Sequence, residues 1–560
     1  MSRSERSKVP AQSSPHALRP AGPPSTPLTT VLELTGAQPV QASGFDPARV
    51  AVTGIEQRSH AVLPGDLFAG LPGAKAHGAR FAADAVARGA VAVFTDAQGA
   101  ESIGDLGVPV LVRERPREVL GELSAALYGN PSRALRVIGI TGTSGKTTTS
   151  YLVEAGLAAA GLSTALIGTI ETRIGGSRVP SALTTPEAPQ LHAMFALMVE
   201  QGVRAVVMEV SSHALALGRV DGVRFAVGAF TNLSQDHLDF HRDLDDYFGA
   251  KRRLFDPSSP VAARTAVVCV DDEWGARLAA DLAGPVTVST TAAPATSPTA
   301  PPATWKVAGA VDAHGGEQRF TADGPDGEVP VRLRLPGRYN VANGLLAVAV
   351  CAAAGVEAAV AAPALAEVDV PGRMQRIDLG QDFLAVVDYA HKPAAVESVV
   401  ATLRAHLRAE NPAAPGRLAV VVGAGGDRDA GKRPLMGAAG ARGADLLIIT
   451  DDNPRTEDPA VIRAALRAGA LEVPEAERAE VREIGDRAAA VAAAVEWARP
   501  GDVVLVAGKG HETGQEIDGV KQPFDDREVL AAAVRRVAGT AHTIHSRSPH
   551  GTDAEDLTIS

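Results

Sequence analysis

Aromatic residues and cysteines are both scarce in this sequence. Phe, Trp and Tyr together make up 4% of the 560 residues, so the hydrophobic cores must consist mainly of Ala, Val and Leu. Only two cysteines occur, Cys269 and Cys351, and both lie in apolar runs. This usage argues against the disulfide framework of a secreted protein and fits a reducing cytoplasm.

Long hydrophobic segments are also missing. The longest apolar run that we find, Leu345 to Ala354, is too short to cross a bilayer. The N-terminus carries Arg and Lys without a following apolar segment, so it does not resemble a secretory signal. A net charge of −11 argues against a protein that wraps nucleic acid. We therefore expect a cytoplasmic protein with no membrane insertion and no nucleic-acid partner.

The most informative stretch runs from Val137 to Ser150, V-I-G-I-T-G-T-S-G-K-T-T-T-S. A short β-branched run predicts a buried strand, and a loop with Gly142 and Gly145 follows it. Lys146 and Thr147 then open a helix that is rich in alanine and leucine. This order wraps backbone N–H groups around a phosphate, and the helix N-terminus adds partial positive charge. Lys146 would reach the outer phosphates and the Thr147 hydroxyl would bind Mg²⁺, which predicts an ATP or GTP site.

The spacing of this loop departs from the usual G-x-x-x-x-G-K-[ST] pattern, which would require Gly where Ile140 stands. The nearest glycines are Gly139 and Gly142, so we expect a tighter variant of the loop. An ordinary glycine-rich turn between a strand and a helix is the alternative. The agreement of strand, loop and helix with the motif favours the phosphate site.

Apolar strand-like runs alternate with helical segments after this loop, and the alternation starts again at Phe383. The pattern predicts two α/β domains, each with a largely parallel sheet covered by helices. Before residue 135, β-like runs around a helical segment predict a smaller α/β domain. Because 560 residues are too many for one core, we expect three domains. Residues 1–45 and 541–560 are expected to be disordered ends, and the Thr287 to Thr304 stretch an exposed loop.

Polar residues at the ends of the predicted strands are candidates for ligand contacts, because ligands collect beyond the carboxyl ends of parallel strands. Glu209 ends the run V-V-M-E-V and could hold Mg²⁺ beside the phosphates; a helix-capping acid is the alternative. His237 lies in T-N-L-S-Q-D-H-L-D-F-H, close to His213 and His241. These histidines lack the cysteines or spaced partners of a zinc site, and a lone histidine is more often structural.

The second α/β domain has four polar clusters at the ends of its strands: Asp388 to Pro393, Gly423 to Met436, Asp451 to Pro459 and Ala507 to Glu512. Arg428 and Arg455 could each clamp a carboxylate in a bidentate fork, and Glu512 could take an ammonium. Loop arginines in surface ion pairs are the alternative. Two arginines and an acid around one crevice suit a zwitterionic amino acid. The residues alone thus predict an ATP-dependent enzyme whose second domain binds a charged small molecule.

Seven motifs occur in order: T-G-T-S-G-K-T-T, M-E-V-S-S-H-A-L, T-N-L-S-Q-D-H-L-D-F-H, L-P-G-R-Y-N-V-A-N-G, V-P-G-R-M-Q, D-Y-A-H-K-P and D-D-N-P-R. Together they resemble the Mur ligases of peptidoglycan synthesis over about residues 46 to 540. The resemblance implies a UDP-substrate-binding domain at 46–134, a central ATP-binding domain at 135–372 and a Rossmann-like amino-acid-binding domain at 373–540.

The resemblance also implies a reaction. ATP, with Mg²⁺, would phosphorylate the D-glutamate carboxylate of UDP-N-acetylmuramoyl-L-alanyl-D-glutamate, and the amine of meso-diaminopimelate would attack the acyl phosphate to form an amide. We expect a monomer. The alternatives are a lysine-adding ligase of the same family, a folate polyglutamate ligase, and a nucleotide-dependent switch or scaffold.

Residue roles follow from the resemblance, position by position. Lys146, Lys251 and His237 would be catalytic, and Lys251 would be carbamylated so that it can hold a second Mg²⁺. The metal positions are Thr147, Glu209, His237 and Lys251. The ATP positions are Gly142, Thr143, Ser144, Gly145, Lys146, Thr147, Thr148, Asn340, Asn343, Arg373 and Asp388. The UDP-substrate positions are Ser59, Ala74, Lys75, Ala76, Thr184, Thr185, Ser211 and Arg219. The diaminopimelate positions are Arg428, Asp452, Asn453, Pro454, Arg455, Gly508 and Glu512.

Two details of the resemblance concern specificity. Meso-diaminopimelate has a carboxylate that L-lysine lacks, and Arg455 would pair with it; left unpaired, the arginine would penalise lysine. Many family members have Asp-Ser-Arg ahead of the Pro-Gly-Asp turn, where this sequence has Arg58, Ser59 and His60. Ser59 is retained, and both of its neighbours differ from that pattern.

Overall fold

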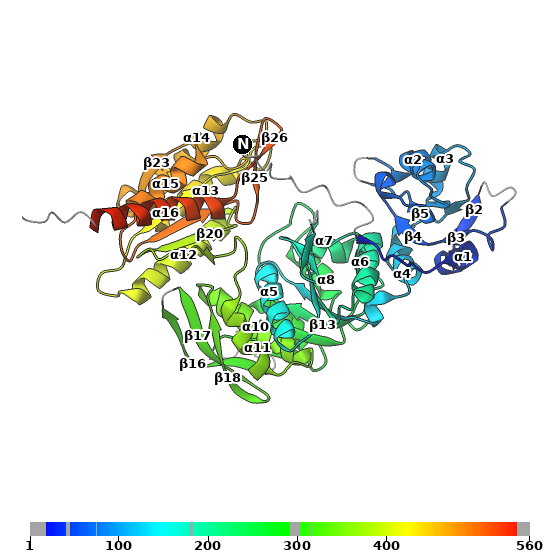
Figure 1. Cartoon of the computed structure of the whole chain (residues 1–560), viewed down its shortest axis with the longest axis horizontal. Coiled ribbons are helices and arrows are strands. Elements are labelled where there is room, and N and C mark those ends of the chain that lie inside the picture. Colours follow the sequence, from blue (N-terminus) through cyan, green and yellow to red (C-terminus); the bar gives the residue numbers. More distant parts are fainter. Residues whose placement is uncertain are drawn as a thin grey trace, which may run out of the picture. The chain divides into compact units, whose positions relative to one another are not determined.

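The computed structural model describes residues 18–40, 45–73, 76–179, 183–291, 303–314 and 316–545. It contains two compact units, one of residues 1–311, 320–332 and 339–368, and one of residues 312–319, 333–338 and 369–560 (Figure 1). Within the described ranges, no helix is both long and apolar enough to cross a membrane.

The first sheet belongs to the N-terminal part of the first unit. Its strand order is β2 (Gln38–Val40), β7 (Val110–Val112), β6 (Ala92–Thr95), β5 (Asp66–Ala69), β4 (Gly54–Glu56). All neighbours are parallel except β2 and β7. The helices of this part are α1 (Leu28–Thr35), α2 (Ala82–Ala87), α3 (Ala97–Ser102) and α4 (Arg117–Leu127). Alternate strand residues point to opposite faces, so Phe94 packs in one core and Val93 in the other.

Ordered structure begins earlier than the sequence suggests. Disorder was expected throughout residues 1–45, but β1 (Thr26–Pro27), α1 and β2 lie within that range, and β1 pairs with β3 (Ala51–Val52). Arg19 forms ion pairs with the buried carboxylates of Asp66 (2.6 Å) and Glu56 (3.5 Å). The prediction was therefore wrong for residues 18–40, because Leu28 and Val31 supply apolar contacts and Arg19 neutralises buried acids. Residues 1–17 lie outside the described ranges.

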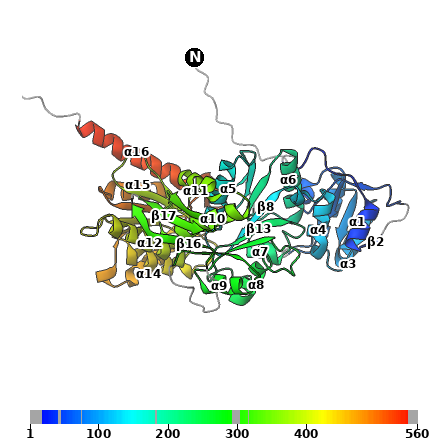
Figure 2. The same ribbon diagram turned by 90° about the horizontal axis from the view of Figure 1, so that it is seen from below.

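The second sheet has eleven strands among the described residues. Their order is β11 (Ser177–Val179), β10 (Thr172–Ile174), β9 (Thr164–Ile167), β12 (Ala205–Glu209), β8 (Arg136–Thr141), β13 (Phe225–Phe230), β14 (Thr265–Cys269), β15 (Val286–Ser289), β16 (Trp305–His314), β17 (Glu317–Gly324), β18 (Gly327–Leu333). From β9 to β16 every pair of neighbours is parallel, and β8 lies between β12 and β13. Figure 2 shows β8 beside β13.

Helices cover the central strands β12, β8 and β13 of this sheet, as the sequence predicts, because these strands are buried along nearly their whole length. They are α5 (Lys146–Ala159), α6 (Ala188–Glu200), α7 (Ser212–Ala216), α8 (Leu244–Arg252), α9 (Glu273–Ala280), α10 (Arg338–Ala353) and α11 (Ala358–Ala364). Leu191 and Phe195 of α6 pack in one core with Val206 of β12. The expected loop from Thr287 to Thr304 begins later than predicted, because residues 287–289 belong to β15; residues 292–302 lie outside the described ranges.

The third sheet forms most of the second unit. Its order is β19 (Gln375–Arg376), β20 (Leu384–Asp388), β24 (Val503–Ala507), β21 (Leu418–Val422), β22 (Leu446–Ile449), β23 (Glu480–Glu483), and only the β19–β20 pair is antiparallel among these described strands. A hairpin of β25 (Gly514–Ile517) and β26 (Val520–Pro523) follows.

Two different groups of helices cover the two faces of this third sheet. Val420 and Leu505 face a core that also contains residues of α12 (Pro393–Glu410), α13 (Lys432–Gly443) and α14 (Pro459–Glu472). Val421 and Val506 face a core with residues of α15 (Arg487–Trp497) and α16 (Asp526–His545). Helix α16 continues five residues beyond 540, where the disordered tail was expected to begin; residues 546–560 lie outside the described ranges.

Candidate functional site

The glycine-rich loop connects the buried strand β8 to α5, as the sequence predicts. Gly142 and Gly145 both have positive φ angles, 144° and 86°, which side chains with a Cβ rarely adopt. A Cβ at Gly142 would collide with the Thr231 hydroxyl, and a Cβ at Gly145 would lie 2.4 Å from Asn343 Oδ1, so both positions require glycine. Lys146 is the first residue of α5, and its Nζ donates to the carbonyls of Gly142 (3.0 Å) and Thr143 (2.9 Å).

The segment after β13 holds the loop from the side. Thr143 N donates to Asn232 O (2.9 Å), and Ser144 N donates to Asn232 Oδ1 (3.0 Å). Asn232 Nδ2 donates back to Ser144 O at 3.1 Å, and Thr231 Oγ1 donates to the same carbonyl at 2.7 Å. The loop therefore has one conformation stabilised by both backbone and side-chain contacts, which reduces the entropy lost on binding a phosphate.

Glu209 is the centre of a polar cluster at the carboxyl end of β12. Its side chain is buried, and both of its carboxylate oxygens accept from the Thr147 hydroxyl at 3.0 Å. Thr169, which follows β9, donates to the same carboxylate through its N–H (2.8 Å) and its hydroxyl (3.0 Å). The predicted pair Thr147 and Glu209 thus lie together, and they offer the hard oxygen donors that Mg²⁺ prefers. Within the described ranges, no group of three or more His, Cys, Asp or Glu side chains is placed to hold a metal ion.

Lys251 of α8 is buried beside the loop. Its Nζ donates to Gly142 O at 2.7 Å and lies 4.4 Å from the centre of the Tyr247 ring. Burial lowers the pKa of Lys251 well below its ordinary value, the charge of Lys146 lowers it further, and Asp236 opposes the shift. A depressed pKa favours the neutral, nucleophilic form of the amine, and that form is the one that reacts with CO₂.

His237 belongs to a group of aromatic rings that also contains Tyr247. The His237 ring centre lies 4.9 Å from that of His213 and 6.0 Å from that of Tyr247. The Tyr247 hydroxyl is 3.1 Å from Thr143 Oγ1 in the phosphate loop. Tyr247 therefore connects Lys251, His237 and the loop, although the sequence analysis did not select it.

Two asparagines of α10 lie against the other side of α5. Asn343 Oδ1 accepts from Thr149 Oγ1 at 3.4 Å, and Asn343 Nδ2 donates to Asn340 Oδ1 at 3.0 Å. Both asparagines are buried. The structure thus places these two predicted ATP positions beside the phosphate loop.

The predicted UDP-substrate positions fall into two groups. Thr184, Thr185, Ser211 and Arg219 surround Glu209: Thr184 Oγ1 is 3.0 Å from Thr169 Oγ1, and Thr185 Oγ1 donates to Glu209 O at 2.9 Å. Ser211 N donates to Thr185 Oγ1 (3.1 Å) and Arg219 Nη1 to Thr185 O (3.4 Å). Ser59 begins a short 3₁₀ helix of the N-terminal sheet domain, and Ala76 is half-buried there. Ala74 and Lys75 lie outside the described residues.

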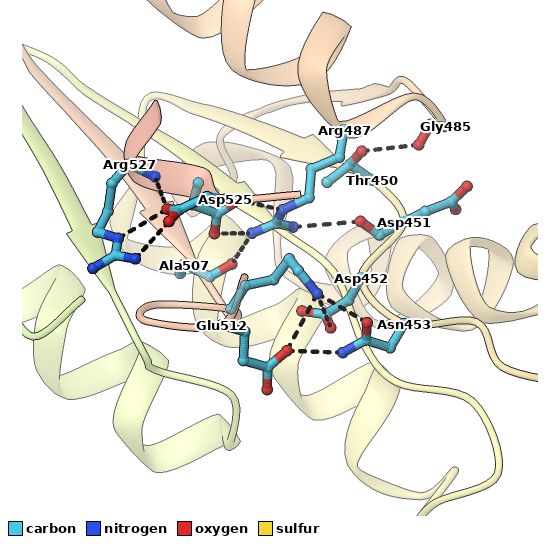
Figure 3. A network of polar contacts seen from close by, with 12 residues as sticks. Thr450, Asp451, Asp452, Asn453, Gly485, Arg487, Ala507, Glu512, Asp525 and Arg527 are labelled. Atoms are coloured by element: carbon cyan, nitrogen blue, oxygen red, sulfur yellow. Dashed lines mark hydrogen bonds and ion pairs between the residues drawn. The ribbon is translucent and has the colours of Figure 1, made fainter. Parts of the chain in front are cut away.

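In the second unit, the predicted amino-acid positions Asp452, Asn453 and Glu512, which Figure 3 labels, surround a buried lysine that was not predicted. Lys509 is fully buried, and its Nζ donates to Asn453 Oδ1 (2.9 Å) and Glu512 Oε2 (3.2 Å). Asn453 Nδ2 donates to the same Glu512 oxygen at 3.0 Å, and Asp452 Oδ1 lies 3.9 Å from Lys509 Nζ. A Cβ at Gly508 would lie 2.6 Å from Asp452 Oδ2, and the φ angle of Gly508 is 121°. Three predicted residues, Asp452, Asn453 and Glu512, thus form one polar network around Lys509, and the predicted Gly508 lies against Asp452.

Arg455 is held in an unusual backbone conformation with φ 54°. Its Nη1 donates to Gly426 O at 2.6 Å, its Nε lies 3.4 Å from Glu516 Oε2, and its backbone N–H donates to Glu516 O at 3.0 Å. The hairpin of β25 and β26 therefore positions this guanidinium. Arg428, by contrast, is exposed on the loop after β21, and the structure gives it no hydrogen bond or ion pair among the described residues.

A fully buried ion pair, Arg487 with Asp526, lies next to the polar network around Lys509. Arg487 Nε and Nη2 donate to the two carboxylate oxygens of Asp526 at 2.7 and 2.8 Å. Arg487 Nη2 also donates to Ala507 O (2.9 Å), the last residue of β24, and Nη1 to Asp451 O (3.4 Å). One side chain thus ties α15 and α16 to the two loops that carry Asp452 and Gly508.

Arg373 and Asp388 lie at the start of the same unit. Asp388 is buried at the end of β20, and its carboxylate accepts from the backbone N–H groups of Met374 and Ala390, both at 2.8 Å. Burial raises the pKa of Asp388, and the charge of Arg373 opposes that shift. Arg373 lies over the Tyr389 ring, 4.6 Å from its centre. These residues order the segment that follows Gly372.

Sequence comparison identifies the family. Three Mur ligase models match consecutive segments: the catalytic domain at residues 51–128, the middle domain at 140–351 and the glutamate ligase domain at 372–510. A UDP-N-acetylmuramoyl-L-alanyl-D-glutamate–2,6-diaminopimelate ligase of Corynebacterium efficiens is 56% identical over 474 residues, which cover 84% of this chain and 87% of the relative. The chain belongs to the Mur ligase family. A ligase of the same name from Streptomyces avermitilis is 51% identical over 93% of this chain and 99% of its own length. A solved structure of that name has a TM-score of 0.63 and 31% identity, and covers 92% of this chain and 99% of its own.

The three-domain α/β fold and the family that the sequence predicts are therefore confirmed. Three contacting residues of this Mur ligase were not predicted: Thr169, Tyr247 and Lys509. Thr169 directly follows a strand, so the same strand-end argument that selected Glu209 could have found it. Tyr247 lies in no recognised motif. Lys509 lies within the polar cluster Ala507 to Glu512, but its position in the sequence does not reveal which side chains it contacts.

Proposed function

We propose that this Mur ligase couples ATP hydrolysis to amide formation between meso-diaminopimelate and the D-glutamate of UDP-N-acetylmuramoyl-L-alanyl-D-glutamate. The observation that carries the proposal is the identity of 51–56%, over most of the chain, with ligases named for 2,6-diaminopimelate. The polar network around Lys509 and the positioned guanidinium of Arg455 support it, because they offer both signs of charge to a zwitterionic amino acid.

In this proposal the central domain activates a carboxylate. The backbone N–H groups of residues 142–145 and the N-terminus of α5 bind the ATP phosphates, and Lys146 turns from the carbonyls of its own loop toward them. The donor chemistry of Thr147 and Glu209 fits Mg²⁺, which would neutralise charge on the transferred phosphate. Lys251, as a carbamate, would add further oxygen ligands. The Tyr247 ring lies near both Lys251 Nζ and the His237 ring.

The C-terminal unit would hold the amine that attacks the acyl phosphate. Glu512 would accept from an ammonium group of the amino acid, and Arg455 would pair with the carboxylate that lysine lacks. The attack forms the C–N bond, expels inorganic phosphate and releases a proton from the amine. We place this reaction in the cytoplasm, because both cysteines are free and buried rather than paired.

A ligation assay tests the proposal directly. Purified protein is given ATP, Mg²⁺, the UDP-muramoyl dipeptide and either meso-diaminopimelate or L-lysine, and both phosphate and the UDP-tripeptide product are measured. We expect phosphate release only when dipeptide and diaminopimelate are both present. Preferential use of lysine would support the lysine-adding alternative instead. Phosphate release without either substrate would contradict a ligase.

A further inference from the structure

An arginine lies at the amino end of each of four neighbouring strands in the central sheet. Arg204 directly precedes β12, Arg136 opens β8, Arg224 directly precedes β13 and Arg264 directly precedes β14. These strands are consecutive in the order β12, β8, β13, β14 and are all parallel, so the four arginines share one edge of the sheet. Neighbouring strands are about 4.8 Å apart, so the arginines form a row across this edge.

A cavity of about 460 Å³ lies at this row. Arg136, Arg224 and Arg264 line it, and Arg133 adds a fourth arginine from the segment that leads into β8. The lining contains no Asp or Glu. The backbone is well held there, since Arg224 N donates to the buried Ser132 hydroxyl at 3.1 Å and Arg264 N donates to Phe225 O at 3.0 Å.

The charges of these arginines are not neutralised by the protein. Across the part of the chain that the structure describes, the side chains of Arg133, Arg136, Arg204, Arg224 and Arg264 have no hydrogen bond or ion pair. Most other arginines of the same unit, such as Arg88 and Arg115, are paired with an acid. Arg133, Arg204, Arg224 and Arg264 are exposed and Arg136 is half-buried, so water hydrates their charges and an anion can reach them. In a chain with a net charge of −11, such a local gathering of unpaired arginines offers a site for an anionic partner.

We propose that this cavity, the arginine-edge pocket, binds a small ligand that carries two or more phosphate groups. Its volume is in the range of small-molecule sites rather than of polymer grooves. Guanidinium groups bind phosphate oxygens in bidentate forks, and a row of guanidiniums suits several linked phosphates better than one. The net negative charge of the protein repels anions at long range, so a phosphate ligand would bind only where several arginines lie close together.

The arginine-edge pocket is separate from the phosphate loop. Strand β8 starts at Arg136 and ends at Thr141, so its six residues place about 20 Å between the pocket and the loop. The pocket also involves residues 132–135, which lie between the matches to the catalytic-domain and middle-domain models of the family. A bound ligand would therefore bridge this connecting segment to the amino ends of β13 and β14.

Calorimetry of the full-length protein with inorganic tripolyphosphate tests the proposal. Lys146→Ala removes the phosphate-loop contact, and Arg224→Gln/Arg264→Gln removes the pocket contacts. The matched control is Arg88→Gln/Arg115→Gln, which changes the net charge equally at paired surface arginines. We expect Lys146→Ala to retain one binding event, and the pocket variant in the same background to bind about tenfold more weakly or not at all. The control variant, made in the Lys146→Ala background, should bind tripolyphosphate as tightly as Lys146→Ala itself.

Two further measurements identify the class of ligand and its place. Citrate, a tricarboxylate, should bind several-fold more weakly than tripolyphosphate, and amide exchange of residues 130–136 should slow when tripolyphosphate binds. Unchanged binding in the pocket variant, equal loss in the control variant, or complete loss of binding in Lys146→Ala would each overturn the proposal. Equal affinity for citrate would overturn its assignment to phosphates.

Discussion

The hydroxyl of Thr147 donates to both carboxylate oxygens of Glu209, at 3.0 Å each, in a buried position where α5 begins and β12 ends. The two residues are 62 positions apart in the chain, and the parallel pairing of β8 with β12 brings them together. Glu209 is also bound by the N–H and hydroxyl of Thr169, so its orientation is set by three donors. Such an arrangement presents oxygen atoms to a metal ion with little reorganisation.

Replacing Glu209 with glutamine should weaken the response to Mg²⁺. The amide keeps the size of the side chain but loses its charge, so we expect the Mg²⁺ concentration for half-maximal ligation to rise roughly 10- to 100-fold. A titration of activity against Mg²⁺ measures the effect. Glu122→Gln, an exposed change on α4, should leave the curve unaltered. An unchanged Mg²⁺ response in Glu209→Gln would remove this residue from the metal site.

Replacing Lys251 with alanine should abolish ligation, because alanine provides neither an amine nor a carbamate. We expect partial recovery with short-chain carboxylic acids, which restore a carboxylate in the vacated space. ¹³C NMR of the wild-type protein with labelled bicarbonate should show a carbamate signal that Lys251→Ala lacks. Lys306→Ala, an exposed lysine paired with Asp323, is the control. Full activity of Lys251→Ala would contradict the carbamate role.

The buried position of Lys251 should also affect the pH dependence of folding. Its pKa is depressed in the folded protein, so between that pKa and about 10.4 the unfolded chain binds one more proton than the folded one. The unmodified protein should therefore gain stability as pH rises through this window, by at most about 1.4 kcal/mol per pH unit. Urea denaturation in CO₂-free buffers between pH 7 and 9 measures the slope. Lys251→Met should have a smaller slope, and an equal slope would show that the lysine is charged when folded.

Arg455 should decide between diaminopimelate and lysine. A lost charge-assisted pair costs about 1.5–3 kcal/mol, so Arg455→Ala should lower kcat/KM for diaminopimelate by roughly one to two orders of magnitude. The kcat/KM for lysine should change much less, since lysine lacks the extra carboxylate of diaminopimelate that would pair with Arg455. Arg482→Ala, on β23, serves as a control because its partner Glu480 is also on that strand. An equal loss for both amino acids would indicate that Arg455 acts by holding the hairpin rather than by selecting the substrate.

The Arg487–Asp526 pair should dominate the stability of the C-terminal unit. Both side chains are fully buried, so Arg487→Ala leaves an uncompensated carboxylate and should lower the free energy of unfolding by about 3–5 kcal/mol. Equilibrium denaturation of the variant and of the wild-type protein measures this change in the free energy of unfolding. The double variant Arg487→Met/Asp526→Leu should be less destabilised than the single one, because no buried charge remains. If the single variant were as stable as wild type, the pair would contribute nothing net.

The regular parts of the fold could be predicted from the sequence. Strands β21 and β24 lie in the region after Phe383 where the alternating pattern predicts a parallel sheet, and both are continuously apolar, as buried parallel strands are. Strands β16–β18 were not predicted, since many of their residues are exposed and the short apolar run Val307 to Val311 of β16 is flanked by the charged residues Lys306 and Asp312. The ordered segment around Arg19 was missed for a related reason: an ion pair with distant acids leaves no local pattern.

The candidate site divides in the same way. Glycines, Lys146 and Thr147 are revealed by a local motif, and Glu209 by its place after a strand. Asn232 belongs to the motif T-N-L-S-Q-D-H-L-D-F-H, but the motif does not reveal that its side chain contacts both the N–H and the C=O of Ser144. Lys509 is next to a predicted glycine, but its contacts with Asn453 and Glu512 depend on how two separate loops meet. Tertiary partners of this kind do not follow from the order of residues.

The position of Arg19 bears on where this protein can be shortened. The family match begins at residue 51, and the composition of residues 1–45 predicted disorder. A version trimmed to residue 46 would nevertheless lose the cation that faces Asp66 and Glu56, together with the strand that pairs with β3. The trimmed chain would keep every motif of the family. Its buried carboxylates Glu56 and Asp66 would, however, keep a single ion pair among the described residues, that of Glu56 with Arg58.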